Sequence, residues 1–225
     1  MTELADIVSE LEHWKMGRGV LLYGAGHTFC SGGDLTLMKS IFEAPKGLHM
    51  SIFMQNTLIR FFRLPLVTMA HVEGRALGGG AELTVACDLR SASKDASIGF
   101  VQARLGIAPG WGGVVRLTQL VGRTRALHLI TSASVLSSKK AHEYGLVEYI
   151  TSNGQDGIDE ARSHLQSLTN ASPGAIQAAK KMVLNATDMD FVKAMQVESS
   201  LFQSVWGSPA HIEAMTANMK FTTET

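Results

Sequence analysis

The sequence alternates between stretches of helical periodicity and short apolar runs bounded by glycine or proline. Apolar residues recur at helical spacing over 1–14 and 50–62, and the apolar runs 19–24 and 65–72 follow these stretches. Runs of this length and composition are typical of strands that are buried on both faces. Strands that alternate with helices pair in parallel, because each helix carries the chain back across the sheet. The sequence therefore predicts an α/β fold with a parallel core.

The pattern continues with a predicted short helix over 82–87, a strand over 88–93 and a helix over 112–121. Beyond residue 122 the strand signal is limited to 147–151, and helical periodicity dominates. Ser172 and Ser208 each precede a proline, as an N-cap residue precedes proline at the first helical position. We therefore predict one compact domain of 225 residues, with the core over 1–122 and a helical region over 123–225.

Composition argues against several classes of partner. Lys plus Arg and Asp plus Glu each total 20, so a net charge of zero gives no general attraction for nucleic acid or an anionic membrane. Every apolar run is interrupted before the roughly 18 residues that a membrane span needs. Cys30 and Cys87 are the only cysteines, which is too few for a disulfide framework or a zinc site. We expect a protein of the cytosol without a targeting segment, a nucleic-acid partner or a membrane partner.

Two glycine-rich segments each follow a predicted strand: HTFCSGGDL over 27–35 and EGRALGGGAEL over 73–83. Three consecutive glycines before a helix let a ligand approach the main chain, and the first amides of that helix lack intrahelical partners. Such a helix start attracts negative charge. The triple glycine alone is equally compatible with a tight turn between strand and helix, whereas the pair of segments is stronger evidence for a ligand site.

The two segments resemble the signatures of the crotonase (enoyl-CoA hydratase/isomerase) superfamily. The first signature matches FCSGGDL over 29–35, and the second matches GRALGGGAEL over 74–83 followed by ACDL over 86–89. A third segment, LGIAPGWGG over 105–113, is similar to the part that follows in the family. The resemblance covers residues 14–220 and implies a spiral of β-β-α units. It also implies a C-terminal helical region that builds homotrimers, often paired into hexamers.

The resemblance further implies an acyl-CoA substrate, with coenzyme A as part of the substrate and no separate cofactor. We also expect no metal site, because the eight histidines never fall at a metal-ligand spacing. Family members normally begin with a β-hairpin and a loop ahead of the helix that here starts at Met1. That loop contributes to the CoA site, so a chain without it is expected to expose a sheet edge and hold its ligand less firmly.

By the same resemblance, the main-chain N–H groups of Gly33 and Gly79 surround the thioester oxygen. An enolate concentrates charge on that oxygen, and each fixed donor in a water-poor pocket lowers the barrier by about 3 kcal/mol. Asp34 is favoured as a turn and helix-cap residue over an acid or a base. Further contacts to the substrate are implied for Ser31, Gly32, Asp34, Leu35, Gly78 and Lys220.

Glu82 stands where hydratases of the family keep one of two catalytic glutamates, and the second position is Gln102. An amide cannot exchange protons with water or carbon at ordinary pH, which disfavours hydration by two glutamates and isomerisation by a carboxylate at residue 102. Decarboxylation of a short branched malonyl-type CoA thioester fits better. The departing carbon dioxide leaves its bonding electrons as the enolate, so no base is needed.

The roles of three side chains stay open at this point. Glu82 is either the proton donor to the carbanion or a carboxylate held by main-chain amides. Gln102 is either a ligand of the departing carboxylate or a structural amide of the pocket wall. Trp111 either shapes and dehydrates the acyl pocket or packs in the core.

Two rival functions also stay open. The first is an enoyl-CoA hydratase or isomerase that uses Glu82 alone or with water. The second is a catalytically silent acyl-CoA-binding subunit, which the expected lack of the hairpin makes plausible. Release of carbon dioxide, loss of enoyl absorbance, and binding without turnover distinguish the three functions.

Overall fold

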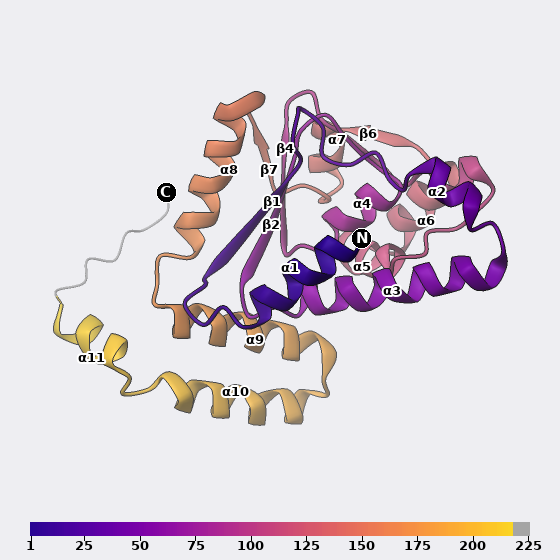
Figure 1. The fold of residues 1–225 in the computed structure, drawn as a ribbon. Helices are drawn as coiled ribbons and strands as arrows, with labels where there is room; N and C mark the ends of the chain where they lie inside the picture. The colour runs from indigo at the N-terminus through magenta and orange to yellow at the C-terminus, as the bar shows by residue number, and fades with distance from the viewer. Residues whose placement is uncertain (218–225) are drawn as a thin grey trace.

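The computed structural model describes residues 1–217, apart from the side chains of Leu35 and Leu37. Two sheets lie at the centre of the molecule (Figure 1). The larger sheet is parallel throughout, in the order β1 (Gly19–Tyr23), β2 (Val67–Val72), β4 (Leu89–Ser93) and β7 (Tyr149–Thr151). In the smaller sheet, β5 (Ser97–Gly99) pairs in parallel with β3 (Arg75–Leu77) and antiparallel with β6 (Val135–Ser137). The predicted α/β fold with parallel pairing is confirmed.

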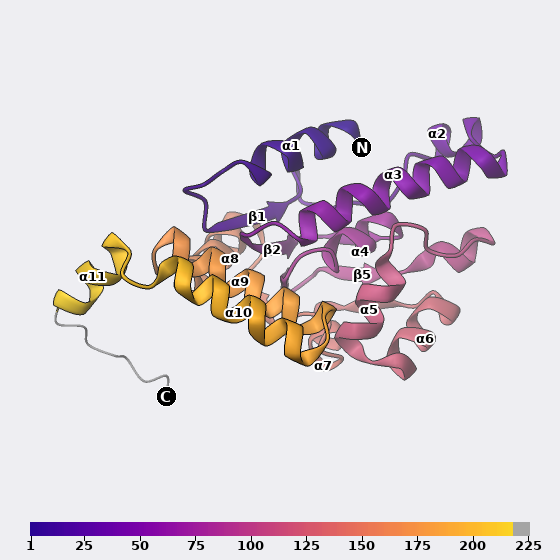
Figure 2. The ribbon, with the colours of Figure 1, turned by 90° about the horizontal axis from the view of Figure 1, so that it is seen from below.

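Helices cover both faces of the larger sheet (Figures 1 and 2). On one face, α1 (Thr2–Glu12) and α3 (Ala44–Phe62) pack their apolar sides against Val20, Leu22 and Ala70. On the other face, α8 (Gly154–Leu168) packs against Leu21 and Met69. Successive strand residues point to opposite faces, so an apolar run without alternation suits a strand that is covered on both sides.

The smaller sheet packs against a third group of helices. α5 (Gly113–Val121), α6 (Arg123–Ser132) and α7 (Ser138–Glu143) bury apolar residues against it. Two short helices lie close to the glycine-rich segments: α2 (Leu35–Ser40) follows the first, and α4 (Gly79–Thr84) starts inside the second. A 3₁₀ turn, η1 (Val101–Leu105), links β5 to the segment before α5.

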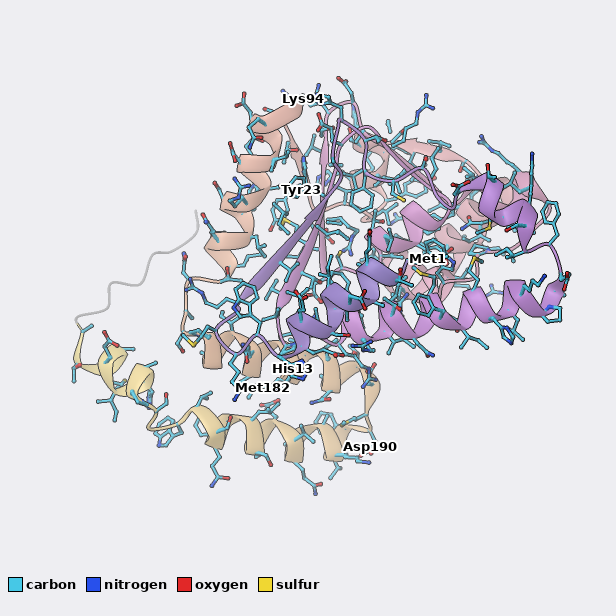
Figure 3. All side chains as sticks on the ribbon, viewed as in Figure 1. Met1, His13, Tyr23, Lys94, Met182 and Asp190 are labelled. Atoms are coloured by element: carbon cyan, nitrogen blue, oxygen red, sulfur yellow. The ribbon has the colours of Figure 1, made fainter. Side chains whose placement is uncertain are left out.

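Of the last three helices, α9 contacts β2 of the larger sheet, and α10 and α11 lie farther out (Figure 1). α9 (Pro173–Asp188) and α10 (Phe191–Val205) lie side by side with α10 on the outer side, and α11 (Pro209–Thr216) continues beyond them (Figure 2). Figure 3 labels Met182 on α9 and Asp190 at the turn into α10. Both predicted caps are confirmed, because Ser172 Oγ accepts from Ala175 N and Ser208 Oγ accepts from His211 N.

Two predicted details differ from the structure. The helix expected over 82–87 begins three residues earlier, at Gly79, although glycine is a poor helix former. β3, β5 and β6 are absent from the sequence-based prediction, because a strand of three residues is too short to show alternation. Across residues 1–217, none of the helices combines the length and the apolar character that crossing a membrane requires.

Candidate active site

Main-chain pairing brings the two glycine-rich segments together. Cys30 N donates to Arg75 O at 2.9 Å, and Leu77 N donates to Cys30 O at 2.9 Å. The two segments stay close together at the start of α4, where a Cβ atom added to Gly80 would lie 2.0 Å from Cys30 O. The segments can pass this closely only because residue 80 has no side chain.

Gly33 and Gly79, the two residues expected to hold the thioester oxygen, lie in these neighbouring segments. A Cβ atom added to Gly32 would lie 3.7 Å from Gly79 N. Gly79 opens α4, so its N–H has no intrahelical acceptor. Within residues 1–217, neither the N–H of Gly33 nor that of Gly79 donates to another group of the protein. Gly32 has φ of +108° and Gly78 has φ of +57°, which side chains disfavour, so glycine sets the path of both segments.

A cavity of about 440 Å³ opens beside the first segment. It lies between α1, α3, α4 and the segment before α5. Its wall is mainly apolar, which suits a short acyl chain. The lining residues are Met1, Leu4, Phe29, Cys30, Gly32, Gly33, Asp34, Met38, Met54, Leu83 and Trp111. Met1 lies at one end of α1, and His13 marks the other (Figure 3).

Four further residues are expected from the sequence to contact the substrate: Ser31, Asp34, Leu35 and Lys220. Asp34 Oδ1 accepts from Thr36 N at 2.7 Å, the contact of a turn or cap residue at the start of α2. Ser31 is exposed and does not line the cavity. The side chain of Leu35 and the whole of Lys220 lie outside the described residues, so their expected substrate contacts stay predictions.

Glu82 is a buried carboxyl group, 2% exposed, with hydrogen bonds to both oxygens. Oε1 accepts from Trp111 N at 2.8 Å and from Gly113 N at 3.0 Å. Oε2 accepts from Gln102 Nε2 at 2.9 Å. A Cβ atom added to Gly113 would lie 2.4 Å from Glu82 Cγ, so glycine at residue 113 lets the carboxyl group reach the start of α5. The sequence-based expectation of a carboxylate held by main-chain amides describes this geometry.

Burial raises the pKa of Glu82, and the N–H groups of Gly113, Trp111 and Gly110 together with Gln102 only partly oppose that rise. A carboxyl group in this environment keeps its proton to a higher pH than an exposed one. Arg116 is the nearby cation. Burial lowers the pKa of Arg116 and the charge of Glu82 acts in the opposite direction, while Nη1 donates to Trp111 O at 3.2 Å. Sequence reasoning did not single out Arg116.

Gln102 contacts Glu82, and neither of these two residues lines the cavity. Its side chain comes from η1, and the residue is 7% exposed. Among the described residues, the Oε1 atom of Gln102 is buried and accepts no hydrogen bond. The structure therefore supports the interpretation of Gln102 as an internal amide more than that of a direct ligand of the substrate.

Trp111 lies both at the cavity and in the apolar core. Its indole ring lines the cavity, and the residue also packs in the apolar core with Met54 and Leu83. The ring lies directly on α4, because a Cβ atom added to Gly79 would lie 2.5 Å from Trp111 Cζ3. Among the described residues, no group of three or more His, Cys, Asp or Glu side chains is arranged to hold a metal ion.

A cavity beside the paired glycine-rich segments, with the buried carboxyl group of Glu82 behind its Trp111 wall, agrees with the acyl-thioester enzyme that the resemblance implies. The family model for enoyl-CoA hydratase/isomerase matches residues 1–221, and the chain belongs to that family. Two curated relatives are named ethylmalonyl-CoA decarboxylase. The relative from Gallus gallus is 43% identical over 222 residues, covering 98% of this chain and 74% of its own length. The relative from Homo sapiens is 41% identical over 223 residues, covering 98% and 73%.

Solved structures agree with the fold. An enoyl-CoA hydratase from Bacillus anthracis superposes with a TM-score of 0.89 at 32% identity, covering 95% of this chain and 83% of that one. An enoyl-CoA hydratase subunit from Geobacillus kaustophilus superposes with a TM-score of 0.82 at 31% identity, covering 94% and 82%. The family and the crotonase-like fold expected from the glycine-rich signatures are confirmed.

Proposed function

We propose that this chain decarboxylates ethylmalonyl-CoA, and also methylmalonyl-CoA, to the corresponding acyl-CoA and carbon dioxide. The names of the curated relatives support this activity. The structural observation that carries it is the pairing of Glu82 with the amide of Gln102, where hydration by two glutamates would need a second carboxyl group. No resident cofactor is needed, because coenzyme A arrives with the substrate.

The proposed reaction begins with the thioester oxygen held by the N–H groups of Gly33 and Gly79. The bond between the α-carbon and the carboxylate then breaks, carbon dioxide leaves, and the electron pair becomes a thioester enolate. Each main-chain donor stabilises that enolate by about 3 kcal/mol. Trp111 and the apolar wall keep water away, which favours loss of the carboxylate charge. A proton from Glu82 then completes the acyl-CoA product.

A paired substrate assay tests this function. The purified chain is mixed with ethylmalonyl-CoA and, separately, with crotonyl-CoA. We expect release of carbon dioxide from the first and no loss of enoyl absorbance from the second. Hydration of crotonyl-CoA without release of carbon dioxide would identify a hydratase instead. Binding of either ester without turnover would identify an acyl-CoA-binding subunit.

The exposed surface of α9 and α10 supports a second proposal, that the chain forms a homotrimer. Two such trimers would pair into a hexamer. α10 contributes no buried residue within a single chain. Large apolar side chains are exposed on these helices and at the C-cap of α10, at Val183, Phe191, Val192, Met195, Phe202 and Trp206. Apolar surface of this extent is typical of a contact between subunits. We place the assembled enzyme in the cytosol, in agreement with its two free cysteines.

A further inference from the structure

Glu82 and Gln102 carry four polar side-chain atoms between them. Three of these atoms take part in hydrogen bonds. The N–H groups of Trp111 and Gly113 donate to Glu82 Oε1, and Gln102 Nε2 donates to Glu82 Oε2. The fourth atom, Gln102 Oε1, is buried and has no hydrogen-bond partner among the described residues. A buried acceptor without a donor destabilises the state in which it is unpaired, so such an atom calls for a structural or functional explanation.

The geometry also determines where a proton on Glu82 must reside. The N–H groups of Trp111 and Gly113 both need Oε1 as an acceptor, so the proton of the acid belongs on Oε2. In the orientation shown, that O–H would meet the NH₂ group of Gln102, with a donor facing a donor. A turn of about 180° at the end of the Gln102 side chain replaces Nε2 by Oε1, the atom that has no partner.

We propose that Gln102 is a positioning residue whose amide turns with the protonation state of Glu82, so that Oε2 holds one proton without loss of a hydrogen bond. Its chemical consequence rests on the decarboxylation proposed above. The O–H group on Oε2 first leaves its hydrogen bond to Gln102 Oε1, and its O–H bond then breaks as the enolate electron pair forms the new C–H bond at the α-carbon. The Gln102 amide then turns back to donate to the carboxylate, and a proton from water restores the acid.

A double-mutant cycle followed by thermal unfolding tests this turn. In Glu82→Gln the side-chain oxygen stays with its two main-chain donors, so the new NH₂ group faces Gln102 as the acid O–H would. If the Gln102 amide turns, it accepts from that NH₂ group. Adding Gln102→Met then lowers the Tm by about 2–4 °C, the effect of one lost hydrogen bond. If the amide is a fixed donor, two NH₂ groups repel and adding Gln102→Met raises the Tm.

The sign of the Gln102→Met effect in the Glu82→Gln background decides between the two models. The same change in the unaltered protein is the matched control, because it should lower the Tm in either model. Gln102→Leu replaces Gln102→Met if the methionine variant does not fold. A rise in Tm in the Glu82→Gln background would overturn the inference. These measurements need no activity, so an inactive parent chain would refute the decarboxylation and leave the cycle interpretable.

The pH profile of decarboxylation is the second measurement. A carboxylate that loses a hydrogen-bond donor is destabilised more than an acid that loses an acceptor. Gln102→Met should therefore move the alkaline limb of the profile to higher pH. Arg116 of α5 is the charged side chain beside Glu82, and it is unchanged in every variant. Loss of the same fraction of the rate at every pH would show a merely structural residue and would contradict the proposal.

Discussion

Replacement of Lys180 by methionine should destabilise the protein strongly, because it removes one partner of a buried ion pair between α9 and the larger sheet. Lys180 Nζ contacts Asp88 Oδ1, and the two side chains are 5% and 20% exposed. Burial lowers the pKa of Lys180 to about 8, so the amine still carries its charge at pH 7. Methionine keeps most of the side-chain volume but leaves the Asp88 carboxylate without its cation.

The size of the effect follows from what remains around Asp88. Loss of one partner from a fully buried pair costs about 3–5 kcal/mol. Asp88 Oδ2 keeps its bonds from Thr68 N at 2.7 Å and Thr68 Oγ1 at 2.9 Å, and the carboxylate is partly exposed. We therefore expect a loss of about 2–3 kcal/mol, which lowers the Tm by about 4–12 °C in a protein of this size.

Circular dichroism during heating, at one fixed protein concentration, measures this loss. Lys140→Met is the matched control, because Lys140 pairs with Glu143 on the surface and both side chains are about half exposed. That change should lower the Tm by under about 2 °C. A Lys180→Met protein that melts within about 2 °C of its parent would refute the argument for the buried pair, as would equal losses in both variants.

Three further predictions concern the site and the assembly. Gly79→Ala forces a Cβ atom to within 2.5 Å of the Trp111 ring and should lower the decarboxylation rate more than tenfold, whereas Gly47→Ala, with no atom within 4 Å, should retain it. An unchanged rate in Gly79→Ala would contradict the close packing. Burial raises the pKa of Glu82 above the ordinary carboxyl value of 4.5, so the folded state keeps a proton that the unfolded chain releases. As the pH rises from the unfolded pKa of this group to its folded pKa, the parent should therefore lose stability relative to Glu82→Gln by about 1.4 kcal/mol for each pH unit. A difference in Tm between the two proteins that stays constant over this pH range would refute the argument. Phe191→Asp should reduce the mass measured by light scattering from that of the proposed trimer to that of a monomer, because Phe191 is 78% exposed in the single chain; an unchanged mass would place the interface elsewhere.

The strands of the larger sheet and most of the helices could be predicted because their apolar patterns are local. Thr68–Val72 is buried on both faces, and α3 shows its apolar side over many turns. β3, β5 and β6 have three residues each, which is too short for a periodic signal. Their positions depend on pairing with distant strands, which the sequence pattern of a single segment does not contain.

Within the candidate site, the residues that belong to local motifs could be predicted from the sequence, and the contacts between distant segments could not. Glycines at 32, 78 and 79 are visible as motifs, because the main-chain path itself requires them. The contact between Gln102 and Glu82 joins η1 to α4 across 20 residues and depends on the direction of both side chains. The same holds for Leu4 of α1 and Met54 of α3, which reach the cavity only through the packing of those helices.

The number of protons that Glu82 and Gln102 can exchange decides which type of reaction this buried pair can support. Hydration of an enoyl thioester needs one group to take a proton from water and another to give a proton to carbon. Glu82 Oε1 is occupied by two main-chain donors, and the amide of Gln102 cannot gain or lose a proton at ordinary pH. In the mechanism proposed above, the pair therefore supplies one proton, from Oε2, in each turnover. Decarboxylation needs no base and consumes one proton at carbon, so its requirement equals what the pair can deliver.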